Sequence, residues 1–156
     1  MDPTNLALLE AELRRDEGVR YSIYPDTKGI PTVGVGHNCQ ASPLPAGLAC
    51  PLTDGQVDQL LAGDLQITFA SLDHALPWWS QMDPVRMRVI CNMCFNLGIT
   101  RLLGFHNTLL AMQRGSYAVA AAGMRASAWF HEVGDRALRL CTAMETGSMP
   151  VVAGVA

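Results

Sequence analysis

The sequence predicts a mostly helical α+β fold in which a small β-hairpin region is combined with a larger set of helices. Residues 19–24 and 30–35 are β-type runs on either side of the turn sequence 25–29, which is typical of a hairpin. The rest of the chain is mostly apolar segments with the spacing of amphipathic helices. Hydrophobic residues make up 49% of the 156 residues, which excludes a disordered chain.

The first predicted helix begins at Thr4 as its N-cap and ends near Gly18. Its apolar side is expected to consist of Leu6, Ala7, Leu8, Leu9 and Leu13. Glu17 then lies at a corner between this helix and the hairpin, and Asp26 lies at the hairpin tip. Residues 38–52 are rich in Pro, Gly and Ser, which predicts a loop.

A long helix is predicted from Thr53 to about residue 75. Thr53 and Gln56 have the spacing of a capping box, which marks the start of a helix. Further along, Val57, Leu60, Leu61 and Asp64 recur at helical spacing, so the pattern places a carboxylate among buried side chains. A buried carboxylate needs a partner.

Asp83 and Pro84 are expected to begin a core helix that ends at Gly98. Further helices are predicted over residues 107–114, after Ser116, and over 135–146.

The domain prediction is one two-lobed domain over residues 1–147. It comprises a hairpin lobe with its loop (18–52), a connecting helix (53–75) and a helical lobe (76–147) packed with the N-terminal helix. The cleft between the lobes is the expected place of an active site. Residues 148–156 carry no charge and no periodicity, and we expect a mobile tail there.

Charge and hydropathy exclude some classes of function. Eleven basic and fourteen acidic residues give a formal charge of −3, which argues against a nucleic-acid partner. Charged and polar residues interrupt every apolar stretch well before the length of a membrane span. The N-terminus lacks the basic start and the cleavage site of a secretory signal peptide, so the expected location is the cytoplasm.

The five cysteines fit neither a paired C-x-x-C zinc site nor a complete disulfide framework, and no metal or cofactor is predicted. Cys91 and Cys94 lie within an apolar helix and are expected to be core residues. Cys39 and Cys50 flank the predicted loop and can bridge in an oxidising compartment, which the sequence leaves open.

Residues 17–37 hold two acids and a threonine at fixed places on short rigid elements. Cleavage of a glycosidic bond needs such groups, an acid for the leaving oxygen and a base for water. The pattern of this stretch resembles the phage-type lysozymes of the T-even class. The resemblance is carried by Glu17, Gly18, Arg20, Tyr24, Asp26, Gly29, Thr32, Gly34, Gly36 and His37, and further along by Asn92, Phe95, Gly98, Gly104, Phe105 and Asn107.

The resemblance implies a lysozyme-like fold and a muramidase. Such an enzyme hydrolyses the β-1,4 bond between N-acetylmuramic acid and N-acetylglucosamine in peptidoglycan. Glu17 is then the general acid, and Asp26 activates a water that Thr32 helps to hold. By matched position Arg136 pairs with the acid, and His37 pairs with Asp64. The residues implied to line the substrate cleft are Gly36, His37, Asn38, Phe95, Asn96, Thr108 and Gly123.

The resemblance further implies a monomeric endolysin that stays in the host cytoplasm until a holin opens the membrane. Peptidoglycan is anionic, so the negative net charge gives little electrostatic steering toward it. Two rival functions are a lytic transglycosylase acting on the same bond and a non-catalytic murein-binding domain. The retained Asp26 and Thr32 favour hydrolysis over the first, and the retained Glu17 argues against the second. Chain spacing does not decide between inversion and retention.

Overall fold

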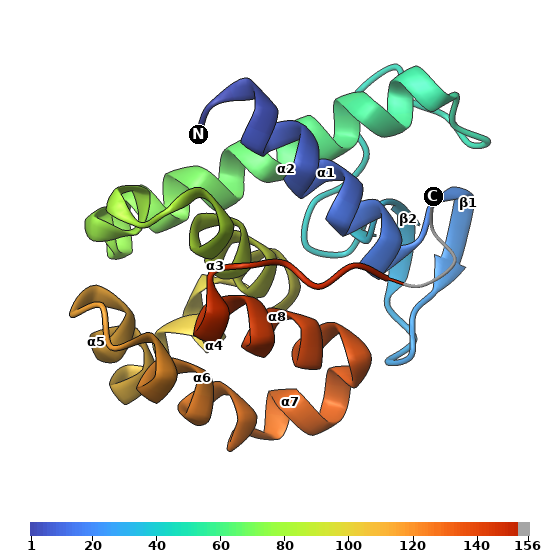
Figure 1. Cartoon of the computed structure of the whole chain (residues 1–156). Coiled ribbons are helices and arrows are strands. Elements are labelled where there is room, and N and C mark those ends of the chain that lie inside the picture. The colour runs from blue at the N-terminus through green and yellow to red at the C-terminus, as the bar shows by residue number, and fades with distance from the viewer. Residues whose placement is uncertain (153–156) are drawn as a thin grey trace. The chain divides into compact units, whose positions relative to one another are not determined.

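The computed structural model describes residues 1–152 and confirms the mostly helical α+β class (Figure 1). The helices are α1 (Pro3–Glu17), α2 (Asp54–Ala75), the 3₁₀ helix η1 (Pro77–Gln81), α3 (Pro84–Leu97), α4 (Ile99–Leu103), α5 (His106–Gln113), α6 (Tyr117–Arg125), α7 (Ala128–Val133) and α8 (Asp135–Thr146). The strands are β1 (Arg20–Pro25), β2 (Pro31–Gly34) and β3 (His37–Asn38). Within the described part of the chain, every helix is too short or too polar to cross a bilayer.

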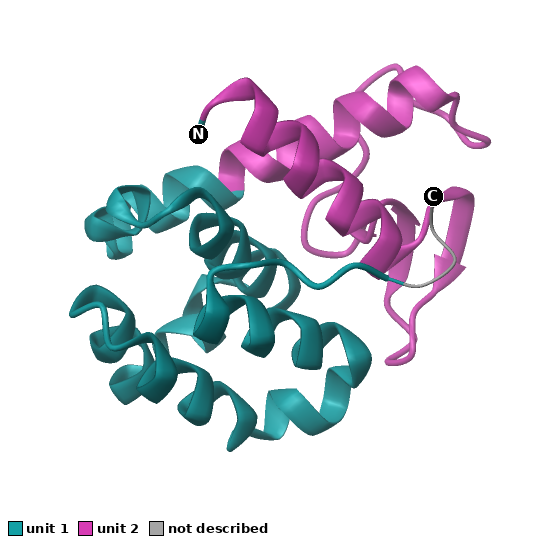
Figure 2. Cartoon of the chain, viewed as in Figure 1, with its two compact units in different colours: residues 1, 68–156 teal, residues 2–67 magenta. Residues whose placement is uncertain are grey.

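The chain divides into two compact units (Figure 2). The sheet unit comprises residues 2–67, and the helical unit comprises residue 1 with residues 68–156. The division falls inside α2, after Ile67. Helix α1 belongs to the sheet unit.

The sheet is antiparallel with the strand order β1-β2-β3. Tyr24 lies opposite Thr32 in the first pair of strands, and Val33 lies opposite His37 in the second. The predicted hairpin is therefore present. The predicted loop of residues 38–52 is wrong at its first residue, because Asn38 belongs to the short strand β3. A strand of two residues has no alternation of side chains that a sequence pattern can display.

Helix α1 begins at a different cap from the one predicted. Asp2, not Thr4, is the N-cap, and its Oδ1 accepts a hydrogen bond of 3.0 Å from the Asn5 backbone N–H. Pro3 at the first position suits this start because a proline lacks the N–H that would be unsatisfied there. Leu9 and Leu13 are buried as expected, whereas Leu8 is exposed because it lies about 100° around the helix from Leu9.

Helix α2 starts at the predicted capping box. The Gln56 backbone N–H donates to Thr53 Oγ1 at 3.2 Å, and the Thr53 backbone N–H donates to Gln56 Oε1 at 3.0 Å. Leu60 and Leu61 are buried, and Asp64 on the same side of the helix is partly buried. The helical spacing therefore identified the buried stripe and the acid on it.

In the helical unit, α3 packs against α8, and α6 packs against both α5 and α8. Asp83 is the N-cap of α3 and Pro84 its first residue, as predicted. The bounds of α8 also match the prediction, and α5 begins one residue earlier than predicted. Helices α4 and α7 were not predicted, because five and six residues are too few to show helical periodicity.

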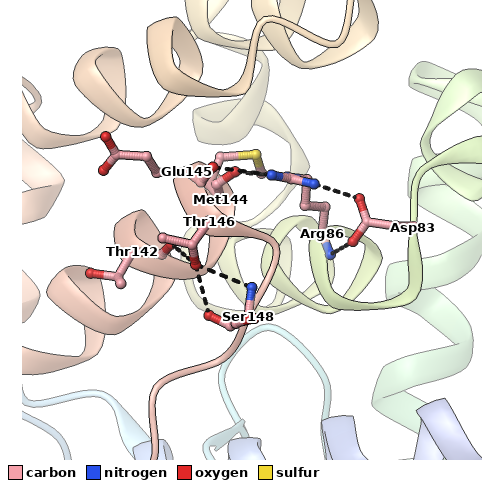
Figure 3. A network of polar contacts seen from close by, with 7 residues as sticks. All are labelled: Asp83, Arg86, Thr142, Met144, Glu145, Thr146 and Ser148. Atoms are coloured by element: carbon pink, nitrogen blue, oxygen red, sulfur yellow. Dashed lines mark hydrogen bonds and ion pairs between the residues drawn. The ribbon is translucent and has the colours of Figure 1, made fainter.

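Arg86 of α3 holds the C-terminal end of α8 (Figure 3). Its Nε donates to the carbonyl of Met144 at 2.7 Å, and its Nη2 donates to the carbonyl of Glu145 at 3.1 Å. Its Nη1 donates to Asp83 Oδ1 at 3.0 Å, and the guanidinium lies 3.7 Å from the centre of the Tyr117 ring. The last carbonyls of a helix have no partner inside it, so Arg86 replaces the missing donors.

The residues after α8 begin with hydrogen bonds to the helix. Thr146 Oγ1 accepts a hydrogen bond of 3.1 Å from the Ser148 backbone N–H and donates one of 2.8 Å to the Thr142 carbonyl (Figure 3). Of the predicted mobile tail, residues 148–156, the last four (153–156) lie outside the described residues.

All five cysteines carry free thiols in this structure. Cys91, Cys94 and Cys141 are buried in the helical unit, as expected for the first two, while Cys39 is partly buried and Cys50 is exposed. Burial raises the pKa of the Cys94 and Cys141 thiols to about 11. Burial also raises the pKa of the Cys91 thiol well above its usual value, so these three thiols are protonated at neutral pH.

Candidate functional site

The predicted site residues fall in both units. The sheet unit holds Glu17, Asp26, Thr32, Gly36, His37, Asn38 and Asp64. The helical unit holds Phe95, Asn96, Thr108, Gly123 and Arg136.

Glu17 is the last residue of α1 and is partly buried against Gly36. A Cβ atom placed on Gly36 would lie 2.9 Å from both Cδ and Oε2 of Glu17. Gly36 also has a φ of +66°, a left-handed conformation that favours glycine. The glycine between β2 and β3 is thus required twice, once by the backbone and once by the carboxyl group that packs on it.

Asp26 is held by the backbone of the turn that follows β1. Its Oδ1 accepts hydrogen bonds of 2.8 Å from the N–H groups of both Lys28 and Ile30. The Asp26 N–H in turn donates to the Ile30 carbonyl at 2.9 Å. One carboxylate oxygen is therefore fixed in direction, while Oδ2 makes no hydrogen bond within the described residues.

Thr32 is buried, with 5% of its surface exposed, and its Oγ1 donates to the Ile30 carbonyl at 2.9 Å. Because its proton is used in that bond, the hydroxyl oxygen has lone pairs left to accept from another donor, such as a water molecule. Asp26 and Thr32 are both hydrogen-bonded to Ile30, one through its N–H and the other through its carbonyl. The backbone of one residue therefore positions both side chains.

His37 and Asp64 make the predicted contact. His37 Nδ1 lies 2.8 Å and 3.0 Å from the two carboxyl oxygens of Asp64, and Nε2 lies 2.7 Å from the Ser42 carbonyl. A carbonyl can only accept, so Nε2 carries a proton. A second proton must then lie between Nδ1 and the Asp64 carboxyl group. Without it, the lone pair of Nδ1 would face the negative charge of a carboxylate, which is repulsive. With both nitrogens engaged, His37 ties β3 to α2 and to the following loop.

From its pairing with His37, the sequence predicts that the pKa of Asp64 is lowered, and this prediction is wrong. Burial raises the pKa of this carboxyl group above its usual value of 3.8, and the hydrogen bond and charge of His37 pull it downward by less. Removal of a carboxylate from water favours its neutral form.

Asn38 uses its side-chain oxygen inside the protein. Its Oδ1 accepts hydrogen bonds of 2.9 Å from the backbone N–H groups of Gln40 and Ala41. A contact of Asn38 with substrate stays a prediction.

The helical unit contains a pocket of about 530 Å³, within the size range of small-ligand sites. Thr108 and Gly123 line it, while Phe95, Asn96 and Arg136 do not. The lining residues are Arg101, Gly104, Phe105, His106, Asn107, Thr108, Gly123, Ser127, Ala128 and Trp129.

Asn96 supports one wall of this pocket. Its Oδ1 accepts a hydrogen bond of 2.9 Å from Nε1 of Trp129, and the Trp129 ring meets Phe105 edge to face at 6.3 Å. Asn96 therefore fixes the orientation of a lining residue. Arg136 is buried in α8, where its Nε donates to Asn92 Oδ1 at 2.8 Å.

Sequence reasoning missed several of the lining residues as site residues. Phe105 and Asn107 had a signal, since both belong to the central stretch that resembles the phage-type lysozymes. Arg101 and His106 had none, because a basic side chain in a short helical segment is ordinary on a protein surface.

Gly123 makes room for the Thr108 side chain. A Cβ atom placed on Gly123 would overlap Thr108 Oγ1. Replacement of a helical glycine by alanine usually stabilises a helix by about 0.5–1 kcal/mol. We expect Gly123→Ala to give this gain only in a Thr108→Ala background, and to destabilise the wild-type protein by about 1 kcal/mol through overpacking. Urea unfolding of the four variants measures the coupling, and equal gains in both backgrounds would contradict it.

Comparison with known proteins gives a family match and several distant relatives. The family model for phage lysozyme matches residues 14–142. The pre-baseplate central spike protein Gp5 of Enterobacteria phage T4 is 28% identical over 95% of this chain, but the chain spans only 29% of that protein. The probable T4-type lysozyme 1 of Dictyostelium discoideum is 26% identical, with 88% of this chain and 93% of the relative covered. The endolysin of Salmonella phage P22 is 28% identical over 70% of this chain and 73% of its own length.

The family match runs from the last part of α1, through the whole sheet, to the middle of α8. It thus includes Glu17, the Asp26 turn, Thr32 and the pocket of the helical unit. This chain belongs to the phage lysozyme family.

Proposed function

We propose that this protein is a muramidase that hydrolyses the β-1,4 bond between N-acetylmuramic acid and N-acetylglucosamine in bacterial peptidoglycan. The main support is the arrangement of Asp26 and Thr32 on the backbone of Ile30, in a member of the phage lysozyme family. Glu17, held against Gly36, supplies the second carboxyl group that hydrolysis of a glycoside requires.

In the proposed reaction Glu17 donates its proton to the glycosidic oxygen as the bond to the anomeric carbon breaks. A water molecule attacks that carbon, and the second carboxylate oxygen of Asp26 takes the proton of the water. Thr32 Oγ1 accepts the other hydrogen of this water, since its own proton is donated to Ile30. The Asp26 carboxylate acts in a fixed direction because two backbone N–H groups hold its other oxygen.

A lytic transglycosylase would cleave the same bond with the sugar's own hydroxyl in place of water. That reaction has no use for a water-binding threonine beside a second carboxylate. The positions of Asp26 and Thr32 on the backbone of Ile30 therefore favour hydrolysis.

The stereochemistry of the product tests the proposal. We expect the β-linked substrate to give the α-anomer first, because direct attack by water inverts the anomeric carbon. Proton NMR during the first turnovers identifies the anomer, and mass spectrometry of the fragments identifies the new end. A β-anomer would mean that a covalent intermediate forms, and an anhydro end would mean transglycosylation.

A further inference from the structure

The turn between β2 and β3 carries the glycine on which the Glu17 carboxyl group packs. Gly34 and Gly36 have φ values of +65° and +66°, so the backbone is left-handed on both sides of the buried Val35. The turn is tight, because Val33 and His37 already lie opposite each other in the two strands. In so short a hairpin the loop length largely fixes the turn geometry, so whatever holds the flanks also holds Gly36.

One face of α2 holds both flanks of this turn. A Cβ atom placed on Gly34 would lie 3.4 Å from Leu60 Cδ2, so the Leu60 side chain lies beside the backbone there. On the other flank, His37 Nδ1 lies 2.8 Å from Asp64 Oδ2. Leu60 and Asp64 are four residues apart in α2, so they lie on the same face of the helix. The turn is therefore attached to one rigid surface at two points.

The His37 ring is a rigid link in this attachment. The side chain is buried, and its second nitrogen, Nε2, lies 2.7 Å from the Ser42 carbonyl. A ring that is hydrogen-bonded on both sides cannot turn without losing one of the two bonds. Since Gly36 directly precedes His37 in the chain, the fixed ring also limits where the Gly36 backbone can lie.

Gly36 passes this constraint on to Glu17. A Cβ atom placed on Gly36 would lie 2.9 Å from Cδ and Oε2 of Glu17 and 3.1 Å from its Cγ, so an α-hydrogen of Gly36 points at the end of that side chain. Glu17 is the last residue of α1, and a glutamate side chain has several rotatable bonds. The contact with Gly36 therefore restricts the direction in which the carboxyl group points.

We propose that His37 and Asp64 are positioning residues for Glu17: they fix the turn to α2, and the turn holds Gly36 where it directs the Glu17 carboxyl group. The pair then contributes to activity as well as to stability. That Glu17 is the acid rests on the proposed function, whereas the contacts that hold it do not. A displacement of about 1 Å near a reacting group can cost about 10²-fold in rate, so a small shift of Gly36 is enough to lower turnover.

The structural test is the nuclear Overhauser effect between the α-protons of Gly36 and the γ-protons of Glu17, divided by the signal between the two α-protons of Gly36. We expect this ratio to fall several-fold in Asp64→Ala. Leu65→Ala is the matched control, since Leu65 is a buried neighbour on a different side of α2 and its truncation should cost comparable stability. Folded and unfolded molecules that interconvert slowly give separate signals, so the ratio describes the folded molecules alone. An unchanged ratio in Asp64→Ala, or an equal fall in Leu65→Ala, would overturn the proposal.

Two glycine substitutions test the contact with the acid through activity. Gly36→Ala places a methyl group against the Glu17 carboxyl group, whereas Gly34→Ala imposes the same left-handed strain and meets Leu60 Cδ2 at an ordinary 3.4 Å. On soluble murein fragments we expect Gly36→Ala to lower kcat by about 10²-fold with a much smaller change in KM, and Gly34→Ala to stay within about threefold of the wild type. Equal losses of kcat would assign the effect to backbone strain, and a loss confined to KM would assign Gly36 to substrate binding. Either result would overturn the proposal.

The same assay on Asp64→Ala connects the pair to the acid. Well below the unfolding temperature of each variant, we expect about a tenfold loss of kcat in Asp64→Ala, and a kcat close to that of the wild type in Leu65→Ala. Equal losses in the two variants would reduce the pair to a structural role and overturn the proposal. A wild type that does not hydrolyse murein would refute the proposed function instead, and the Overhauser measurement would still decide whether the pair positions Glu17.

Discussion

Replacement of Glu17 by Gln is expected to reduce peptidoglycan hydrolysis by about 10²–10⁴-fold, the usual loss when a general acid is removed. The amide keeps the shape that packs on Gly36, so the substitution removes the proton and leaves the contact in place. The expected result is therefore a loss of turnover without a comparable loss of stability.

The measurement is the release of soluble fragments from purified cell walls, with thermal unfolding of each variant recorded beside it. Glu10→Gln is the matched control, because it makes the same chemical change on the same helix α1. Turnover close to that of the wild type in Glu17→Gln would show that another group donates the proton. Equal losses in both variants would point to a general effect on α1.

Disruption of the contact between His37 and Asp64 is expected to cost about 3–5 kcal/mol of unfolding free energy in either single variant, His37→Asn or Asp64→Asn. His37 is 4% exposed and has both ring nitrogens engaged, so a single substitution leaves a buried group without its partner. The double variant should lose much less than the sum of the two. Urea unfolding of all four proteins gives the coupling energy, and a value near zero would mean that the two side chains act independently.

The same pair gives a dependence of stability on pH. The folded pKa of Asp64 is raised by burial above the usual value of 3.8, so its contribution is fully present below that value and is lost as pH rises through the folded pKa. As pH rises above about 4, the unfolding free energy of the wild type should therefore fall relative to that of Asp64→Asn. A shift in the wild type's favour would mean that attraction by His37 outweighs burial.

Local signals in the sequence predicted the fold well where one or two residues determine the start of an element. Thr53 with Gln56 and Asp83 with Pro84 are such signals, and both helices begin where these residues predict. The short elements β3, α4 and α7 had no such signal, since packing against neighbours rather than periodicity defines them. The pKa of Asp64 was mispredicted for a related reason: the pattern showed its partner but not how much water the surroundings remove.

For the candidate site too, the sequence identified single residues but not the geometry that depends on packing. The spacing of the first motif identified Glu17, Asp26 and Thr32 as residues to examine, and their roles in catalysis stay a prediction. The close approach of Glu17 to Gly36 follows from the turn between β2 and β3, which the motif marks only by a glycine. The pocket of the helical unit combines residues from α4 to α7, so its lining is defined only when those helices are packed.

The distribution of the thiols makes the native protein selectively reactive toward alkylating agents. A thiol with a pKa of about 11, as for Cys94 and Cys141, is ionised to about one part in ten thousand at neutral pH, and burial also blocks access to the reagent. Cys50 is exposed and Cys39 partly so, and these two lie at either end of the segment that leads from β3 toward α2. A maleimide dye or spin label added to the folded wild type is therefore directed to this one segment, without any cysteine having to be removed. The three core thiols become reactive only on unfolding, so their modification reports opening of the helical unit.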